Sequence, residues 1–299
     1  METIFHILAR ELDQPERYVE NVAGLLDEGN TIPFIARYRK ELHGSMDDTT
    51  LRTLEERLQY LRNLEKRREE VKGAIENQGK LTGELSAAID NAATLAEVED
   101  LYRPYKQKRR TRATVAREKG LEPLAALLYA QEKDCPEPLE AAAAYVDPEK
   151  GVESAEDALR GASDIIAEDI SDDAGVRKAL REYMLRRSEL VAAAAKEEDS
   201  VYRLYYDFRQ NVGRVQGHQV LAINRGEREE FLKAGVETNR DEAMVILRRR
   251  IVQPGTRAAE FMKSVVEDSY DRLLYPSLER EVRNMLTRGS VVLYKQSIL

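Results

Sequence analysis

The chain has 299 residues, of which 42% are hydrophobic and 34% charged, and its formal net charge is −8. This charge excludes a protein that attracts a polyanion through its total charge, so nucleic-acid binding would need a local excess of Lys and Arg. The single cysteine excludes an internal disulfide framework, and we therefore expect a reducing, cytoplasmic compartment.

The composition predicts an all-α, multihelical fold built from long amphipathic helices. Ala, Leu, Glu and Arg are abundant, and their unbranched side chains lose little rotamer freedom in a helix. No apolar run approaches the roughly 20 residues that a membrane-spanning helix needs. The first ten residues have the pattern of an amphipathic helix rather than of a targeting segment. We therefore expect no membrane partner.

Three helices are predicted in the first 40 residues. Asp13 is a plausible N-cap for the second helix, and Gly29 a plausible exit from it. A short third helix through Phe34 and Tyr38 follows. Residues 15–40 can accordingly be drawn as a helix-turn-helix-like part whose third helix presents a small basic patch of Arg37, Arg39 and Lys40 to DNA. Two helices joined by a glycine turn also occur in many helical proteins that bind no DNA.

Further helices fill most of the remaining chain. Residues 50–78 form a long, mostly exposed helix, because their leucines fall on a single stripe. Residues 173–196 are predicted as another long helix that ends in an alanine run. Residues 201–208 could be a strand or a buried helix start, and 211–226 look loosely structured because of their glycines. Residues 240–252 and 256–287 are predicted to be helical again, the second with a kink at Pro276.

The sequence predicts neither a catalytic site nor a metal site. The three histidines lie far apart, and Cys135 has no visible base partner, so a packed, inert thiol is the favoured interpretation. The acidic cluster could in principle hold a divalent cation, but its members are better explained as helix caps and as the solvated end of a helix. The cluster consists of Asp164, Glu168, Asp169, Asp172 and Asp173. We expect no cofactor.

The basic segment, residues 103–119, is the strongest functional signal. Its positive residues are Arg103, Lys106, Lys108, Arg109, Arg110, Arg112, Arg117 and Lys119, and with Glu118 they give a net charge of +7. Cations on a connector can neutralise phosphates without regard to sequence, and Tyr102 and Tyr105 could stack on single-stranded bases. Alternatively, the segment pairs with acidic helices such as the one that contains Glu97, Glu99 and Asp100.

Four motifs together resemble the Tex family of bacterial transcription accessory proteins. They are Asn30–Glu41, Glu99–Arg112, Ala116–Leu124 and His218–Glu227, and the resemblance extends from the first helix to about Leu286. It implies a helical N-terminal domain followed by a central helical region. The glycines of 211–226 also make that region the best candidate for a change of structural unit, so we place the boundary near residue 200 and assign residues 1–199 and 200–287 to the two parts. Residues 288–299 depart from the family pattern and stay unassigned.

The resemblance also implies a role. Family members continue with a Holliday-resolvase-like domain, helix-hairpin-helix motifs and an OB-type RNA-binding domain, so we expect this chain to be the front part of a longer protein. The leading hypothesis is a non-enzymatic accessory factor of bacterial transcription that binds RNA or DNA non-specifically. The alternative is a protein-interaction scaffold that contacts RNA polymerase or positions the later domains. A nuclease is disfavoured, because no carboxylates are placed to hold two metal ions.

Overall fold

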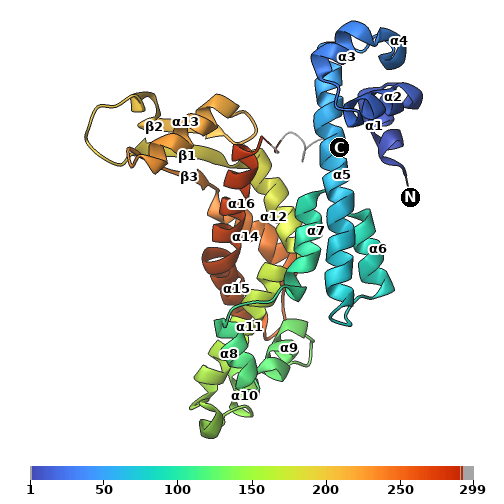
Figure 1. The fold of residues 1–299 in the computed structure, drawn as a ribbon. Coiled ribbons are helices and arrows are strands. Elements are labelled where there is room, and N and C mark those ends of the chain that lie inside the picture. The colour runs from blue at the N-terminus through green and yellow to red at the C-terminus, as the bar shows by residue number, and fades with distance from the viewer. Residues whose placement is uncertain (1, 290, 292–299) are drawn as a thin grey trace. The chain divides into compact units, whose positions relative to one another are not determined.

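The computed structural model describes residues 2–289 and 291 and divides the chain into two compact units. The first unit ends at Val98 and the second begins at Glu99 (Figure 1). Both are built mainly from helices, which confirms the predicted class in its main part. The predicted boundary at residues 199 and 200 does not coincide with this division, since both residues lie inside the second unit.

The first unit is organised around one long helix. Its helices are α1 (Ile4–Leu12), α2 (Glu16–Asp27), α3 (Ile32–Tyr38), α4 (Lys40–His43), α5 (Asp48–Glu76) and α6 (Gly83–Asn91). Helices α1, α2 and α3 pack on one end of α5, while α6 packs on its other end (Figure 1). The aspartate Asp47 caps α5 by accepting a hydrogen bond from the backbone N–H of Thr50 at 2.7 Å. This cap satisfies a backbone donor that the first turn leaves unpaired.

A leucine stripe and a buried ion pair hold the first unit together. The predicted stripe on α5 is buried, with Leu51 and Leu54 fully enclosed. Arg57 on the same helix is 2% exposed, and its guanidinium donates two hydrogen bonds to the carboxylate of Glu11, at 2.7 and 2.9 Å. Such two-point contacts between arginine and carboxylate fix geometry as well as charge, so they set how α1 lies against α5.

The second unit has α11 at its centre. Its helices are α8 (Arg112–Glu118), α9 (Glu122–Ala130), α10 (Pro138–Ala143), α11 (Ala155–Asp172), α12 (Ala174–Arg187), α13 (Gly217–Arg228), α14 (Arg240–Ile251), α15 (Ala259–Asp268) and α16 (Tyr275–Thr287). The element α7 (Leu95–Tyr102) includes the boundary between the units. Helix α11 contacts α8, α9, α10, α12 and α15. It is therefore the element against which the basic segment is held.

A small sheet corrects the prediction of an all-α fold. Strands β1 (Glu189–Ala194), β2 (Asp207–Asn211) and β3 (Leu232–Glu237) form an antiparallel sheet in the order β2-β1-β3. Most of the alanine run lies in β1, so the predicted helix over 173–196 is wrong after Arg187. Because β1 is hydrogen-bonded on both sides, tertiary pairing outweighs the helix preference of alanine.

The neighbouring loops are more ordered than the glycines suggested. Residues 201–208, for which the sequence left a strand and a buried helix start as alternatives, contain a short 3-10 turn, η3 (Arg203–Tyr205), and the start of β2. Helix α13 occupies most of the region that was predicted to be loose. A β-carbon on Gly226 would lie 2.5 Å from Cδ1 of Leu232, so this glycine permits close packing of α13 on β3.

The helix is irregular just before Pro276, where the sequence predicts a kink. Residues Ser269–Leu274, labelled η4, form a π-helical turn between α15 and α16. Pro276 then lies in the first turn of α16. Proline has no N–H to donate to the preceding turn, and a widened turn accommodates that loss.

Candidate nucleic-acid interface

The basic segment begins as a short 3-10 turn, η1 (Arg103–Tyr105), and ends in α8. Thr111 caps α8: its hydroxyl accepts from the backbone N–H of Thr114 at 3.1 Å. The same hydroxyl donates to a carboxylate oxygen of Glu168 on α11 at 2.8 Å. The cap therefore fixes the helix start and also ties the segment to α11.

Two carboxylates on α11 bind three cations of the basic segment. Glu168 and Asp172 are four residues apart, so they project from the same helix face. Arg103 donates to Asp172 at 2.8 Å, and the ammonium of Lys108 contacts Asp172 and, at 3.3 Å, Glu168. Arg117 donates to Glu168 at 3.1 Å. Much of the local positive charge is thus neutralised within the unit.

This pairing corrects the prediction for the acidic cluster. Glu168 and Asp169 were predicted as the solvated end of a helix, but Glu168 is only 12% exposed, whereas Asp169 is 53% exposed. Asp172 was predicted as a cap, but it is 11% exposed and pairs with Arg103 and Lys108. Asp173 does cap α12, as predicted, by accepting from the backbone N–H of Val176 at 2.7 Å. Burial alone would raise the pKa of Glu168, but hydrogen bonds from Thr111 and the nearby cations outweigh it and lower that pKa. The ionised form is therefore stabilised in place.

Two further cations of the segment are paired near the surface. Lys106 contacts Glu99 at 2.6 Å, which agrees with the predicted alternative of pairing to the acidic helix, and Arg110 contacts Glu118 at 2.9 Å. Five of the eight cations are therefore in ion pairs. Within residues 2–289 and 291, Arg109, Arg112 and Lys119 make none.

The weaker predicted patch shows the opposite arrangement. We call Arg37, Tyr38, Arg39 and Lys40 the α3 surface. Its three cations make no ion pair with any residue that the structure describes, and Tyr38 is 55% exposed. The guanidinium of Arg37 lies 6.0 Å from the ring centre of Tyr38, and that of Arg39 lies 5.3 Å from the ring centre of Phe34. Aromatic faces hold both guanidinium groups without neutralising them.

Sequence reasoning missed a buried charge network that uses arginines for structure. Arg177 and Arg181 on α12 donate to the same oxygen of Asp100, at 3.0 and 2.8 Å. Arg181 also donates to Glu281 on α16, and its side chain is fully buried. The partners are 77 to 104 residues apart in sequence, so no local pattern could have revealed them. Burial alone would lower the pKa of Arg181, but the two carboxylates outweigh it and raise that pKa.

The side chains considered for catalysis have ordinary structural roles. Cys135 is 2% exposed, and burial raises the pKa of its thiol, which disfavours the reactive thiolate. Within the described part of the chain, no group of three or more His, Cys, Asp or Glu side chains could hold a metal ion. No helix among the same residues is both long and apolar enough to cross a membrane.

The fold and the two basic surfaces define a mostly helical protein in which each compact unit displays cations. The chain belongs to the Tex family: residues 2–76 match the Tex-like protein N-terminal domain, and residues 133–290 match the Tex central region-like model. The first match ends with the last residue of α5. The second covers α10 to α16 and the sheet, and so includes α11, whose carboxylates bind cations of the basic segment.

Curated relatives extend well beyond this chain. It is 45% identical to the uncharacterized protein YdcI of Bacillus subtilis, over 94% of this chain and 40% of the relative. It is 38% identical to the transcriptional accessory protein Tex of Neisseria gonorrhoeae, over 96% and 39%. It is 32% identical to the human S1 RNA-binding domain-containing protein 1, over 93% and 30%. The chain therefore spans about two fifths of the length of these relatives, or less.

Proposed function

We propose that this chain is a non-enzymatic, nucleic-acid-binding part of a transcription accessory factor, and that the α3 surface is its main phosphate-contacting site. The observation that supports the proposal is the set of three cations without carboxylate partners among the described residues, of which Arg37 and Lys40 are exposed, beside the exposed Tyr38. Unpaired cations release counterions from nucleic acid without first breaking an internal ion pair.

The names of two relatives support a role in transcription and nucleic-acid binding. One relative is named a transcriptional accessory protein and another an S1 RNA-binding domain-containing protein. Binding to phosphates and stacking on bases need no sequence reading, so the proposal is for non-specific contact. Single-stranded RNA is the first substrate to test, because exposed Tyr38 can stack only on a base that is not already stacked in a duplex.

The predicted helix-turn-helix is a narrower form of the same proposal. Helices α2 and α3 are joined by a short turn, but α3 has only seven residues and ends at Tyr38. Two of the three cations, Arg39 and Lys40, follow the end of α3 rather than lying along its length. This placement favours contacts to the phosphate backbone over contacts to base edges in a groove.

The test is a salt titration of binding by the chain to fluorescent single-stranded RNA, single-stranded DNA and duplex DNA. The first-unit triple variant (Arg37→Ala, Arg39→Ala, Lys40→Ala) should weaken single-strand binding and flatten the plot of log affinity against log salt by about 2, since each phosphate contact contributes about 0.7. Unchanged affinity and slope would remove the α3 surface from the proposal.

A matched control separates the effect of the α3 surface from the effect of the net charge. Arg10→Ala, Arg52→Ala and Lys66→Ala remove the same charge from the same unit, but each of these exposed cations contacts a carboxylate. This control should bind much as the parent does. Equal losses in both triple variants would mean that total charge, rather than the α3 surface, governs binding.

A protein-interaction scaffold is the second candidate, and a different observation favours it. Val201 and Leu204, in the connection between β1 and β2, are 86% and 87% exposed. Exposed apolar side chains of this kind are typical of protein contacts. Recovery of RNA polymerase subunits by the tagged chain after nuclease treatment, and its loss in a Val201→Ser and Leu204→Ser variant, would support this role.

The non-enzymatic part of the proposal has its own test. Three acidic side chains of α11 contact cations of the basic segment: Glu168, Asp169 and Asp172. They are therefore occupied by side-chain partners. Incubation of labelled RNA and DNA with the pure chain and magnesium should leave both intact, and cleavage that co-purifies with the chain would contradict the proposal.

A further inference from the structure

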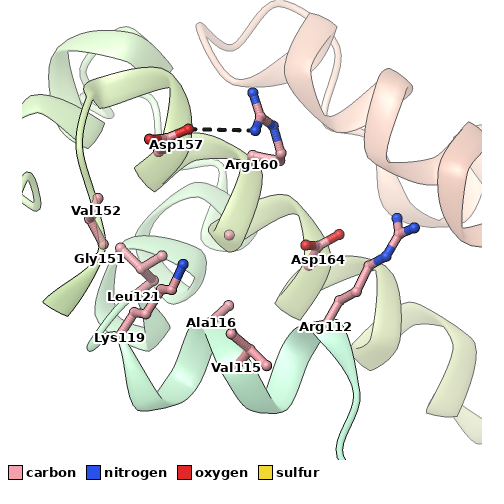
Figure 2. Close-up of a pocket in the computed structure, with 11 residues that line it drawn as sticks. Arg112, Val115, Ala116, Lys119, Leu121, Gly151, Val152, Asp157, Arg160 and Asp164 are labelled. Carbon is pink, nitrogen blue, oxygen red and sulfur yellow. Dashed lines mark ion pairs between the residues drawn. The ribbon is translucent and has the colours of Figure 1, made fainter.

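We propose that a hollow between α8 and α11 is a subsite for one nucleotide of a single strand, with Arg112 and Lys119 as its phosphate ligands (Figure 2). The inference deepens the proposed function and rests on it. It adds a defined site in the second unit, where most other cations of the basic segment are already paired.

The hollow is formed by matching faces of two helices. Arg112, Val115, Ala116 and Lys119 follow the spacing of one helix face on α8 and at its C-terminal cap. Gly161 lies opposite them on α11, where a β-carbon would be 2.2 Å from Cδ1 of Leu121 and 3.4 Å from Cβ of Ala116. Small residues thus bring the two helices together at the floor, and the charged side chains stand at the two ends (Figure 2).

The charges that line the hollow leave one positive charge in excess, since Arg112, Lys119 and Arg160 face Asp157 and Asp164. Each carboxylate that lines it has another cation nearby: Asp157 is 3.5 Å from Arg160, and Asp164 is 3.7 Å from Arg272. Within the described part of the chain, Arg112 and Lys119 have no ion-pair partner. A bound phosphate would supply the missing negative charge at either end.

The two cations are held in position by the backbone around them. Arg112 is the first residue of α8, whose start is fixed by the Thr111 cap. Lys119 lies across Gly151, where a β-carbon would be 3.8 Å from its ammonium nitrogen. Gly151 has a φ of +78°, a conformation that other residues rarely adopt. The turn itself therefore favours a glycine, and Lys119 packs across it at ordinary contact distance.

The size of the hollow favours one unit of a polymer over a free metabolite. Its volume is about 190 Å³, below the roughly 300 Å³ at which pockets for free small molecules begin, so it would enclose only part of a nucleotide and leave the strand to continue outside it. Val115, Ala116 and Leu121 supply an apolar floor for a sugar or base. Asp164 can accept a hydrogen bond from a ribose hydroxyl or a base amino group.

The experiment compares two double variants that remove equal charge from the same segment. Arg112→Ala with Lys119→Ala alters the hollow, whereas Arg109→Ala with Arg110→Ala alters exposed cations that do not line it. The probe is a fluorescent five-nucleotide single-stranded RNA of mixed sequence. The first variant should lose about tenfold in affinity, the effect of roughly one charge-assisted hydrogen bond, and the second should lose much less.

A third variant tests occupancy without changing charge. Val115 lines the hollow and is half-exposed, so Val115→Phe fills the space while leaving every cation in place. This variant should weaken binding of the same RNA, and cross-linking of a thiouridine-containing RNA to peptides of α8 and α11 should fall with it. Circular dichroism and thermal unfolding of each variant verify that the fold is intact.

The outcomes distinguish this inference from the proposed function. If the parent chain binds the RNA, but the two double variants lose equal affinity and Val115→Phe binds normally, the hollow is not a subsite and the proposed function stands. If the parent chain binds no single strand at all, both are wrong. A selective loss in the hollow variants, together with cross-links on α8 or α11, supports the subsite.

Discussion

The α3 surface and the basic segment differ in a way that the sequence conceals. The basic segment has a net charge of +7 over 17 residues, whereas the α3 surface has only three cations. In the folded protein, five cations of the basic segment contact carboxylates, and none of the α3 surface does so within the described residues. In the described part of the chain, each segment therefore leaves three cations without an ion pair, but these are all the cations of the α3 surface and only three of the eight in the basic segment.

The difference teaches that distant partners decide how much local charge is available. The carboxylates that hold Lys108 lie 60 and 64 residues further along the chain, on α11. An ion pair of this kind must be broken before its cation can bind a phosphate, and that cost reduces the gain from counterion release. Density of charge along the sequence and availability of charge on the surface are separate properties.

The largest expected effect concerns the arginines that the second unit uses internally. Arg181→Ala would leave Asp100 and Glu281 without their fully buried partner. Removing one member of such a network typically costs about 3–5 kcal/mol. Urea unfolding should show this loss, while Arg37→Ala in the first unit should leave the free energy of unfolding nearly unchanged. Similar stability for the two variants would contradict the division between structural and displayed cations.

The next effect concerns stacking at the α3 surface. Tyr38→Ala should reduce affinity for single-stranded RNA by about 1–3 kcal/mol, the usual contribution of one stacked base. Phe34 is half-exposed beside it, with ring centres 5.2 Å apart. Fluorescence anisotropy measures the loss, with Tyr129→Ala, a 38% exposed tyrosine in the second unit, as control. Equal losses of affinity for the two substitutions would contradict the assignment of Tyr38 as the residue that stacks on a base.

A smaller effect should follow from releasing the paired cations. Glu168→Gln with Asp172→Asn removes the carboxylates that hold Arg103, Lys108 and Arg117. We expect tighter binding of single strands and a salt slope steeper by about 1 to 2.

The control for this release is Glu140→Gln with Glu153→Gln, which changes net charge equally. Both glutamates are exposed and make no ion pair in the part of the chain that the structure describes. If the control pair steepens the salt slope as much as the pair on α11, the slope reports total charge, and the release account is wrong.

The smallest expected effect is a pH dependence of the stability that the contacts of Glu168 with the basic segment provide. The folded protein lowers the pKa of Glu168 below its ordinary value of 4.5, so its contribution to stability is present above that value and is lost as pH falls through the lower, folded value. The stability difference between the parent chain and Glu168→Gln should therefore shrink between about pH 6 and pH 3. Urea unfolding at both pH values measures it, and a constant difference would contradict the account.

Local patterns predicted the helices better than they predicted their partners. The stripe on α5 and the cap at Asp173 follow from neighbours within one or two turns, so the sequence sufficed. Strand β1 was missed because alanine favours helix locally, and only pairing to β2 and β3 makes it a strand. The glycines that led to a predicted boundary near residue 200 include Gly217 and Gly226, and both belong to helix α13.

The same reasoning explains the outcome at the candidate site. The sequence identified every cation of the basic segment, but it could not say which of them Glu168 and Asp172 would neutralise, because those contacts depend on how α11 packs against α8. The hollow was also hidden, since Arg112 and Gly161 meet only in the folded unit. The predicted tail, residues 288–299, lies mostly outside the described residues.

The most direct measurement compares salt slopes for two triple variants that remove equal charge. One is the first-unit triple variant at the α3 surface, and the other is Lys106→Ala, Lys108→Ala and Arg110→Ala, all three paired in the structure. Our account predicts that the first variant loses about 2 from the slope for single-stranded RNA, and that the second loses much less. A larger loss for the paired cations would contradict it.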